Sequence, residues 1–118
     1  MAFADSAKLS MAAAVYDSHG QLITFARMDA ASVGSANAAQ WKGLSAAIYQ
    51  YSTAQTAKWN VPNAPDISTV PGGIPIKTVE GYILGAIGVS GAASSIDVKC
   101  AEAGIRAARS LGIIAWKD

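Results

Sequence analysis

The first third of the chain consists of two apolar runs separated by a short polar segment. Residues 9–17 (LSMAAAVYD) and 22–29 (LITFARMD) are short, mostly apolar and free of proline. The polar segment between them is Asp17-Ser18-His19-Gly20, and Asp at the first position with Gly at the last is typical of a type I turn. Two strands joined by so short a turn predict an antiparallel β-hairpin.

The residues after this hairpin predict a long helix and then a long loop. Residues 35–57 lack proline and are rich in alanine. Their large apolar side chains recur every three or four positions and predict one buried helix face made of Trp41, Leu44, Ile48 and Tyr51. The following segment, NVPNAPDISTVPGG, holds three of the four prolines. A loop of this length is often functional.

The last third repeats the pattern of a hairpin followed by a helix. Residues 74–79 (IPIKTV) and 82–89 (YILGAIGV) flank the dipeptide Glu80-Gly81, which predicts the second hairpin. Ser94 then begins a helix, and Asp97 three positions later fits a capping box. Residues 112–116 (GIIAW) predict a fifth short strand. This order of elements indicates an α+β fold with an antiparallel sheet.

The glycine-rich run GAIGVSG, residues 85–91, does not indicate a nucleotide site. Its glycines follow the spacing G-x-x-G-x-x-G, whereas the dinucleotide fingerprint is G-x-G-x-x-G. Gly85 and Gly88 fall inside a strand whose two faces are both apolar, so we expect them to permit close backbone contacts. Helices or a partner subunit should cover both faces. Gly91 remains a candidate anion-binding turn before the last helix.

Composition restricts the class of protein. The 118 residues predict one domain, spanning 1–118. Only 14% of the residues are charged, so part of the surface is expected to be buried in a homo-oligomer. The net charge of +1 without a basic cluster argues against nucleic-acid binding. No signal peptide or membrane span is evident, which predicts a cytoplasmic protein without membrane partners.

Five motifs occur in order along most of the chain. They are Val15-x-Asp17-x-x-Gly20, ARMDAA (26–31), PGGIPI (71–76), GAIGVSG (85–91) and AEAGI (101–105). Together they resemble the GlcG/HbpS family, which includes the C-terminal domain of PduO. The resemblance implies a profilin-like α/β/α sandwich with a five-stranded antiparallel sheet. It also implies oligomers and, in some members, haem binding. The chain departs from the family in its short segment before residue 11 and in Ala30, where the family commonly has Gly.

Three residue types could ligate a haem. His19 is the only histidine, and histidine is the usual proximal ligand, although a turn histidine can equally be an exposed residue without a ligand. Cys100, the only cysteine, lies on the apolar stripe of the last helix and is expected to be a buried structural thiol. It also excludes an internal disulfide and a zinc site built from several cysteines. Met11 and Met28 are expected in the core.

A second group of residues could form a small-molecule site. Arg27 and Asp29 should point to the same face at the end of the second strand, where they could bind a carboxylate and move a proton, or form a structural ion pair. Lys42 matches a lysine common at this place in the family and could be a pocket cation or a solvated residue. Gly72 and Gly73 lie in the 71–75 loop, whose backbone N–H groups suit a pocket wall.

Three functions follow from these residues. The first is a protein that binds haem or a related small molecule in a pocket near residues 71–75, with His19, Gly72, Gly73 and Gly91 as binding residues. The second is an enzyme without an organic cofactor, an isomerase or lyase using Arg27, Asp29 and Lys42 for proton transfer. The third is a structural or assembly subunit. No metal site is predicted, and ligand binding is the preferred interpretation.

Overall fold

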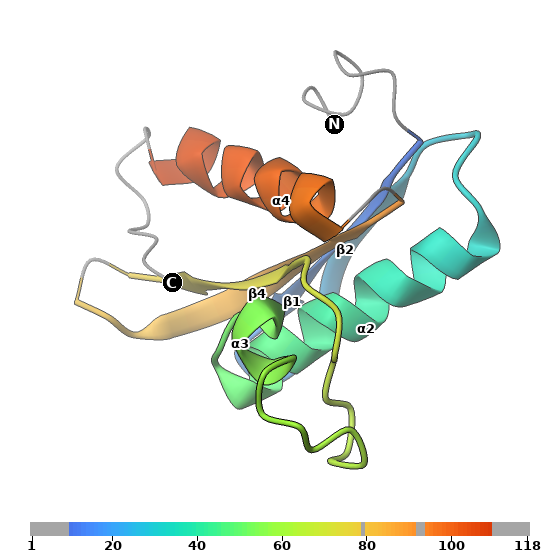
Figure 1. The fold of residues 1–118 in the computed structure, drawn as a ribbon. Coiled ribbons are helices and arrows are strands. Elements are labelled where there is room, and N and C mark those ends of the chain that lie inside the picture. Colours follow the sequence, from blue (N-terminus) through green and yellow to red (C-terminus); the bar gives the residue numbers. More distant parts are fainter. Residues whose placement is uncertain (1–9, 79, 92–93, 110–118) are drawn as a thin grey trace.

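The computed structural model describes residues 10–78, 80–91 and 94–109, which form a sheet covered by helices on both faces (Figure 1). The strands are β1 (Ala12–Asp17), β2 (Leu22–Arg27), β3 (Gly73–Lys77) and β4 (Ile83–Ser90), and they lie in the order β2-β1-β4-β3. All neighbouring strands are antiparallel. The helices are α2 (Val33–Tyr49) and α3 (Thr53–Thr56) on one face and α4 (Ser94–Arg109) on the other. Two helical layers around a sheet confirm the predicted α+β class.

The sheet of the described residues has four strands, whereas the family resemblance implies five. The predicted fifth strand, residues 112–116, lies outside the described residues. Within the four-stranded sheet, β2 and β3 are the edge strands and β1 and β4 are central. Both predicted hairpins, β1–β2 and β3–β4, are confirmed.

The first hairpin turn is held by the side chain of Asp17. Its Oδ1 atom accepts hydrogen bonds from the backbone N–H groups of His19 (2.8 Å) and Gln21 (3.0 Å). Gly20 adopts φ +81°, a left-handed conformation that favours glycine. Asp17 and Gly20 therefore have the turn roles that the sequence predicted.

Helix α2 is shorter than predicted because the chain leaves the helix at residue 50. Ser32 caps its start by accepting a hydrogen bond from Ser35 N–H. Gln50 adopts φ 64° and ends it with a left-handed C-cap. A second helix, α3, begins after Ser52, so the prediction of one helix over residues 35–57 is wrong.

Apart from Lys42, the buried face of α2 consists of small residues, which contradicts the predicted face of large apolar side chains. Trp41, Ile48 and Tyr51 are 37%, 41% and 54% exposed. The residues of α2 that are buried are instead Ala36, Ala39, Lys42, Gly43, Ser45, Ala46 and Ala47. A Cβ atom on Gly88 of β4 would collide with the backbone of Gly43. Where Gly43 meets Gly88, the helix and strand approach so closely that no side chain fits between them.

The opposite face of the sheet packs against α4. Its core contains Met11, Ile74, Val89, Cys100 and Ala101, with Met28 partly buried beside them. The expectations that both methionines and Cys100 belong to the core are confirmed. Strand β4 is thus covered by α2 on one face and α4 on the other, as its two apolar faces predicted.

Candidate functional site

Lys42 forms a buried ion pair that crosses from one helical layer to the other. Its Nζ atom lies 2.9 Å from Oδ2 of Asp97 and donates to the carbonyl oxygen of Val89 at 3.1 Å. The two charged side chains are only 3% and 2% exposed. Lys42 is therefore neither solvated nor in an open pocket, because its ammonium is already held by a carboxylate and a backbone carbonyl.

The glycines of the 71–75 loop make room for this lysine. A Cβ atom on Gly72 would lie 2.6 Å from the carbonyl oxygen of Val89 and 2.8 Å from Cδ of Lys42. A Cβ atom on Gly73 would collide with the backbone carbonyl of Lys42 and lie 2.8 Å from Cγ2 of Thr53. The structure thus brings Lys42, Gly72 and Gly73 together, but as packed neighbours that leave no space at these two residues for a ligand.

Arg27 and Asp29 lie at a different place and are exposed. Strand β2 ends at Arg27, so Met28 and Asp29 lie beyond the strand in a turn. Among the described residues the salt bridge is the one between Lys42 and Asp97, so Arg27 and Asp29 do not form the structural ion pair that was one alternative. The three residues predicted to move protons do not converge on one buried site.

His19 is exposed in the first hairpin turn. Asp17, at the end of β1 next to this turn, pairs with Gly85, whereas Val89, the contact of Lys42, pairs with Ala13. Four residues of strand span about 13 Å, so His19 lies at the opposite end of the sheet from the Lys42 pair. His19 and the pair Gly72–Gly73 thus lie at different ends of the sheet.

The turn that carries His19 lies against the outer flank of α2. A Cβ atom on Gly20 would lie 3.0 Å from Cγ2 of Ile48 and 3.2 Å from Cδ1 of Leu44. Ile48 is 41% exposed, and Leu22, just after the turn, is 48% exposed. No hydrogen bond joins the imidazole of His19 to any described residue. The imidazole of His19 therefore has no hydrogen-bond partner among the described residues, and the next residue, Gly20, lies against Leu44 and Ile48 of α2.

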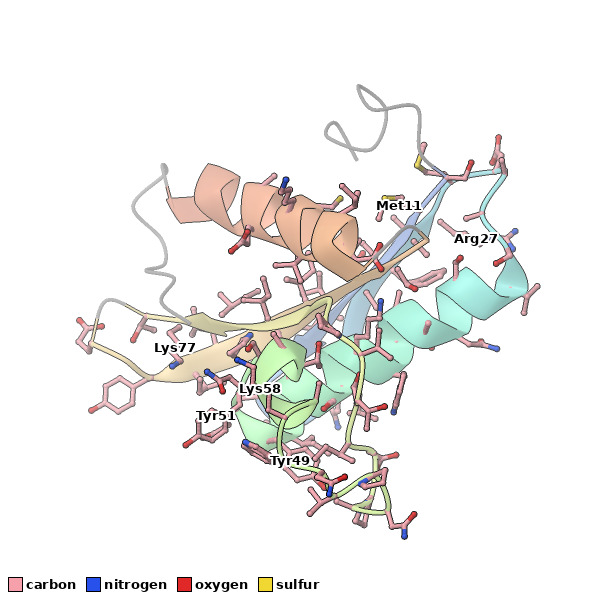
Figure 2. All side chains as sticks on the ribbon, in the orientation of Figure 1. Met11, Arg27, Tyr49, Tyr51, Lys58 and Lys77 are labelled. Carbon is pink, nitrogen blue, oxygen red and sulfur yellow. The ribbon has the colours of Figure 1, made fainter. Side chains whose placement is uncertain are left out.

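An aromatic cluster lies just beyond the C-terminal end of α2. The ring of Trp59 packs edge-on against Tyr49 and Tyr51, with centroids 6.3 and 5.2 Å apart. The hydroxyl of Tyr49 donates to the carbonyl of Pro65 at 2.6 Å. Figure 2 shows both tyrosines and Lys58 around α3, on the side of the molecule opposite Arg27. The expectation that Tyr51 is a core residue is wrong, since more than half of its surface is exposed.

The long loop is anchored to α2 by hydrogen bonds that the sequence pattern did not reveal. The indole N–H of Trp41 donates to the carbonyl of Ile67 at 2.9 Å. Ser68 donates its N–H to Oγ of Ser45 at 2.9 Å, and its carbonyl accepts from Thr56 Oγ1 at 2.6 Å. Ser45 and Thr56 are fully buried, so they position the loop and are not available to a ligand.

The two remaining candidate residues, Gly91 and Cys100, are packed against other parts of the protein. Gly91 adopts φ +137°, and a Cβ atom there would contact the backbone of Ser10 and Met11. Burial raises the pKa of the Cys100 thiol, and the charge of Asp97 raises this pKa further. A raised pKa disfavours the thiolate that a haem ligand or nucleophile requires.

The described residues contain no group of three or more side chains that could hold a metal ion. None of the helices in the described part of the chain is long and apolar enough to cross a membrane.

Comparison with known proteins identifies the family. The profile described as "Haem degrading protein HbpS-like" matches residues 1–106. The chain belongs to the HbpS-like family. No curated protein matches the chain. Membership of the HbpS-like family confirms the resemblance drawn from the five motifs.

Solved structures agree with this HbpS-like assignment. The crystal structure of HbpS is 28% identical with a TM-score of 0.82, and the similarity covers 90% of this chain and 79% of that chain. A double mutant of Streptomyces reticuli HbpS is 27% identical with a TM-score of 0.83, covering 90% of this chain and 76% of the other. A structure described as the PduOC:Heme complex has a TM-score of 0.85 at 21% identity, covering 98% and 87%. The last likeness shows a shared fold. At the family level, the HbpS-like match supports a protein that binds haem or a small molecule.

Proposed function

We propose that this HbpS-like chain binds haem, or a similar flat anionic ring, on the surface around the His19 turn, with the imidazole of His19 as axial ligand. The observation that carries the proposal is the position of the only histidine. It is exposed, its ring has no hydrogen-bond partner among the described residues, and the next residue, Gly20, lies against Leu44 and Ile48. Histidine nitrogen is the commonest axial ligand of haem iron.

The residues around His19 suit such a ligand. Exposed apolar side chains from β2 and α2, Leu22 and Ile48, can cover the face of a ring. Lys77 pairs with Ile83 close to the end of the sheet that carries the turn, and Figure 2 shows Lys77 and Lys58 on this side of the molecule. Their ammonium groups could pair with the ligand's carboxylates. When bound, haem would supply the iron centre, and these residues would hold and orient it.

The 71–75 loop takes a supporting role in this proposal. Gly72 and Gly73 pack against Lys42 and Thr53, so we place the ligand at the His19 end of the sheet. The loop then stabilises the fold between the two helical layers. The exposed Arg27 and Asp29 lie at the other end and do not contribute to the proposed site.

Titration with hemin tests the proposal. The full chain should shift the Soret band of hemin and saturate near one equivalent per chain. His19→Ala should abolish the shift, whereas Ser18→Ala, in the same exposed turn, should leave it unchanged. Ile48→Glu should weaken binding several-fold, because it places a carboxylate under the ring. A free-hemin spectrum with the unmodified chain would refute haem binding, and a normal spectrum with His19→Ala would refute ligation by His19.

A further inference from the structure

Met28 connects three backbone segments at the point where β2 ends. Its N–H donates to the carbonyl of Met11 at 3.0 Å, which continues the β1–β2 pairing one residue beyond Ala12 and Arg27. Two residues paired in this way in an antiparallel ladder normally exchange both of their N–H···O bonds. The carbonyl of Met28, however, accepts from Ala31 N–H at 2.9 Å, in the turn that leads into α2. The N–H of Met11 therefore needs a different acceptor.

The side chain of Met28 supplies this acceptor. Met11 N–H donates to Sδ of Met28 at 3.3 Å. A thioether sulfur is a weak acceptor, so this bond is the weaker of the two that join the residues. Met28 also packs, partly buried, against the core that contains Met11 and Cys100. The last bond of the hairpin is thus made by a sulfur atom, whose chemistry oxidation can change.

We propose that Met28 is an oxidation site, at which a peroxide converts the thioether to a sulfoxide and loosens the end of the β1–β2 hairpin. The sulfur attacks one oxygen of the peroxide, so an S–O bond forms and the O–O bond breaks. With hydrogen peroxide, the leaving oxygen takes up the proton of the transferred oxygen and departs as water. The sulfur loses two electrons, and the peroxide gains them. Sulfoxide reductases can reverse this modification.

Solvent exposure favours Met28 over the other described sulfur atoms. Met28 is partly exposed, whereas Met11 is 0% and Cys100 is 9% exposed. Burial also raises the pKa of the Cys100 thiol, which disfavours the thiolate form that peroxides attack. Among these three residues, we therefore expect a peroxide to oxidise Met28 first.

The sulfoxide cannot keep the contacts of the thioether. The sulfur lies 3.3 Å from the nitrogen of Met11, which leaves no room for an oxygen atom between them. An oxygen that accepts from this N–H has to push the sulfur away, and an oxygen that points elsewhere leaves the N–H facing a sulfur with one lone pair fewer. Either arrangement loosens the pairing of Met11 with Met28 and disturbs their packing in the core. This inference does not depend on haem binding.

Hydrogen peroxide treatment of the full chain without haem, followed by peptide mass spectrometry, tests the site. Met28 should be oxidised at least about tenfold faster than Met11 in the folded chain and at about the same rate in urea. After oxidation the amide of Met11 should exchange about tenfold faster, with little change at Val89, whose N–H donates to Gly72. Reduction by the two sulfoxide reductases, which together act on both epimers, should restore slow exchange at Met11.

Met28→Leu is the matched variant, because leucine is similar in size and has no sulfur. Its Met11 amide should exchange fast before peroxide is added, and peroxide should not change that rate. Oxidation of Met28 no faster than that of Met11 in the folded chain would overturn the site. Unchanged exchange at Met11 after complete oxidation of Met28 would overturn the loosening of the hairpin. If Met28→Leu does not fold, the response of the unmodified chain to peroxide and to the reductases decides.

Discussion

Lys42 of α2 and Asp97 of α4 are 55 positions apart in the sequence, and their charged atoms meet at 2.9 Å inside the protein. The helices lie on opposite faces of the sheet, so this pair joins the two layers (Figure 1). The backbone carbonyl of Val89 completes the environment of the ammonium. Removing one member of such a pair leaves the other charge buried without its partner, which is far more costly than removing both.

Substituting either member should therefore destabilise the fold strongly. We expect Lys42→Met and Asp97→Asn each to lower the free energy of unfolding by about 3–5 kcal/mol. The double variant Lys42→Met/Asp97→Leu should lose clearly less than the sum of the two single changes, because no buried charge remains. Urea denaturation measures the free energy of unfolding of the unmodified chain, the two single variants and the double variant. Single variants within about 1 kcal/mol of the unmodified chain would contradict a buried, tightly coupled pair.

Gly72 offers a test of the packing around the lysine, with Gly81 as its matched control. Both adopt a left-handed backbone, with φ +136° and +92°. A Cβ atom on Gly72 meets Val89 and Lys42, whereas one on Gly81 meets nothing within 4 Å. Gly81→Ala should cost about 1 kcal/mol through its φ angle, and Gly72→Ala should cost roughly 2 kcal/mol more. Equal losses in thermal or urea unfolding would show that the space at residue 72 is not restricted.

The thiol of Cys100 should react slowly with alkylating agents. It should also make the free energy of unfolding fall at alkaline pH. Burial and Asp97 raise the pKa of its thiol above the ordinary value of 9.0. The folded state therefore retains this proton more tightly than the unfolded state. The resulting stabilisation is complete below pH 9.0 and is lost as pH rises through the folded-state pKa. Iodoacetamide at pH 8 should label the folded chain much more slowly than the urea-unfolded chain.

The control for this titration is Cys100→Ser. In this variant the free energy of unfolding should no longer fall at alkaline pH through titration of the thiol. Its remaining pH dependence should match that of the unmodified chain. Labelling of the folded chain at the rate of the unfolded chain would contradict the raised pKa.

The sequence predicts those helices, strands and turns that depend on residues close together in the chain. The turn Asp17–Gly20 closes a hairpin through one side chain and one left-handed glycine, and both are visible within four residues. The two apolar faces of residues 82–89 indicated a strand covered on both sides, which β4 is. Gly88 was expected to permit close backbone contact, and its contact with Gly43 confirms this.

The sequence did not predict which side chains are buried where this depends on the distance between α2 and the sheet. The periodicity of Trp41, Ile48 and Tyr51 predicts a buried face only if helix and sheet pack at the usual spacing. Here Gly43 and Gly88 bring the backbones together, so the large side chains are displaced to the outside. The sequence also does not predict the ion pair of Lys42 with Asp97, because no local pattern links the two residues. The capping-box pattern had assigned that aspartate a purely local role.

Two positions of the β3 edge are poorly suited to pair with a further strand. Val89 N–H donates to the carbonyl of Gly72, so by alternation Gly73 and Pro75 face away from β4. Gly73 N–H already donates to Oγ1 of Thr53, and Pro75 has no N–H group. Proline and occupied donors are among the features that keep an edge strand from pairing with another chain. The Pro-Gly-Gly-Ile-Pro segment thus disfavours growth of the sheet from this edge.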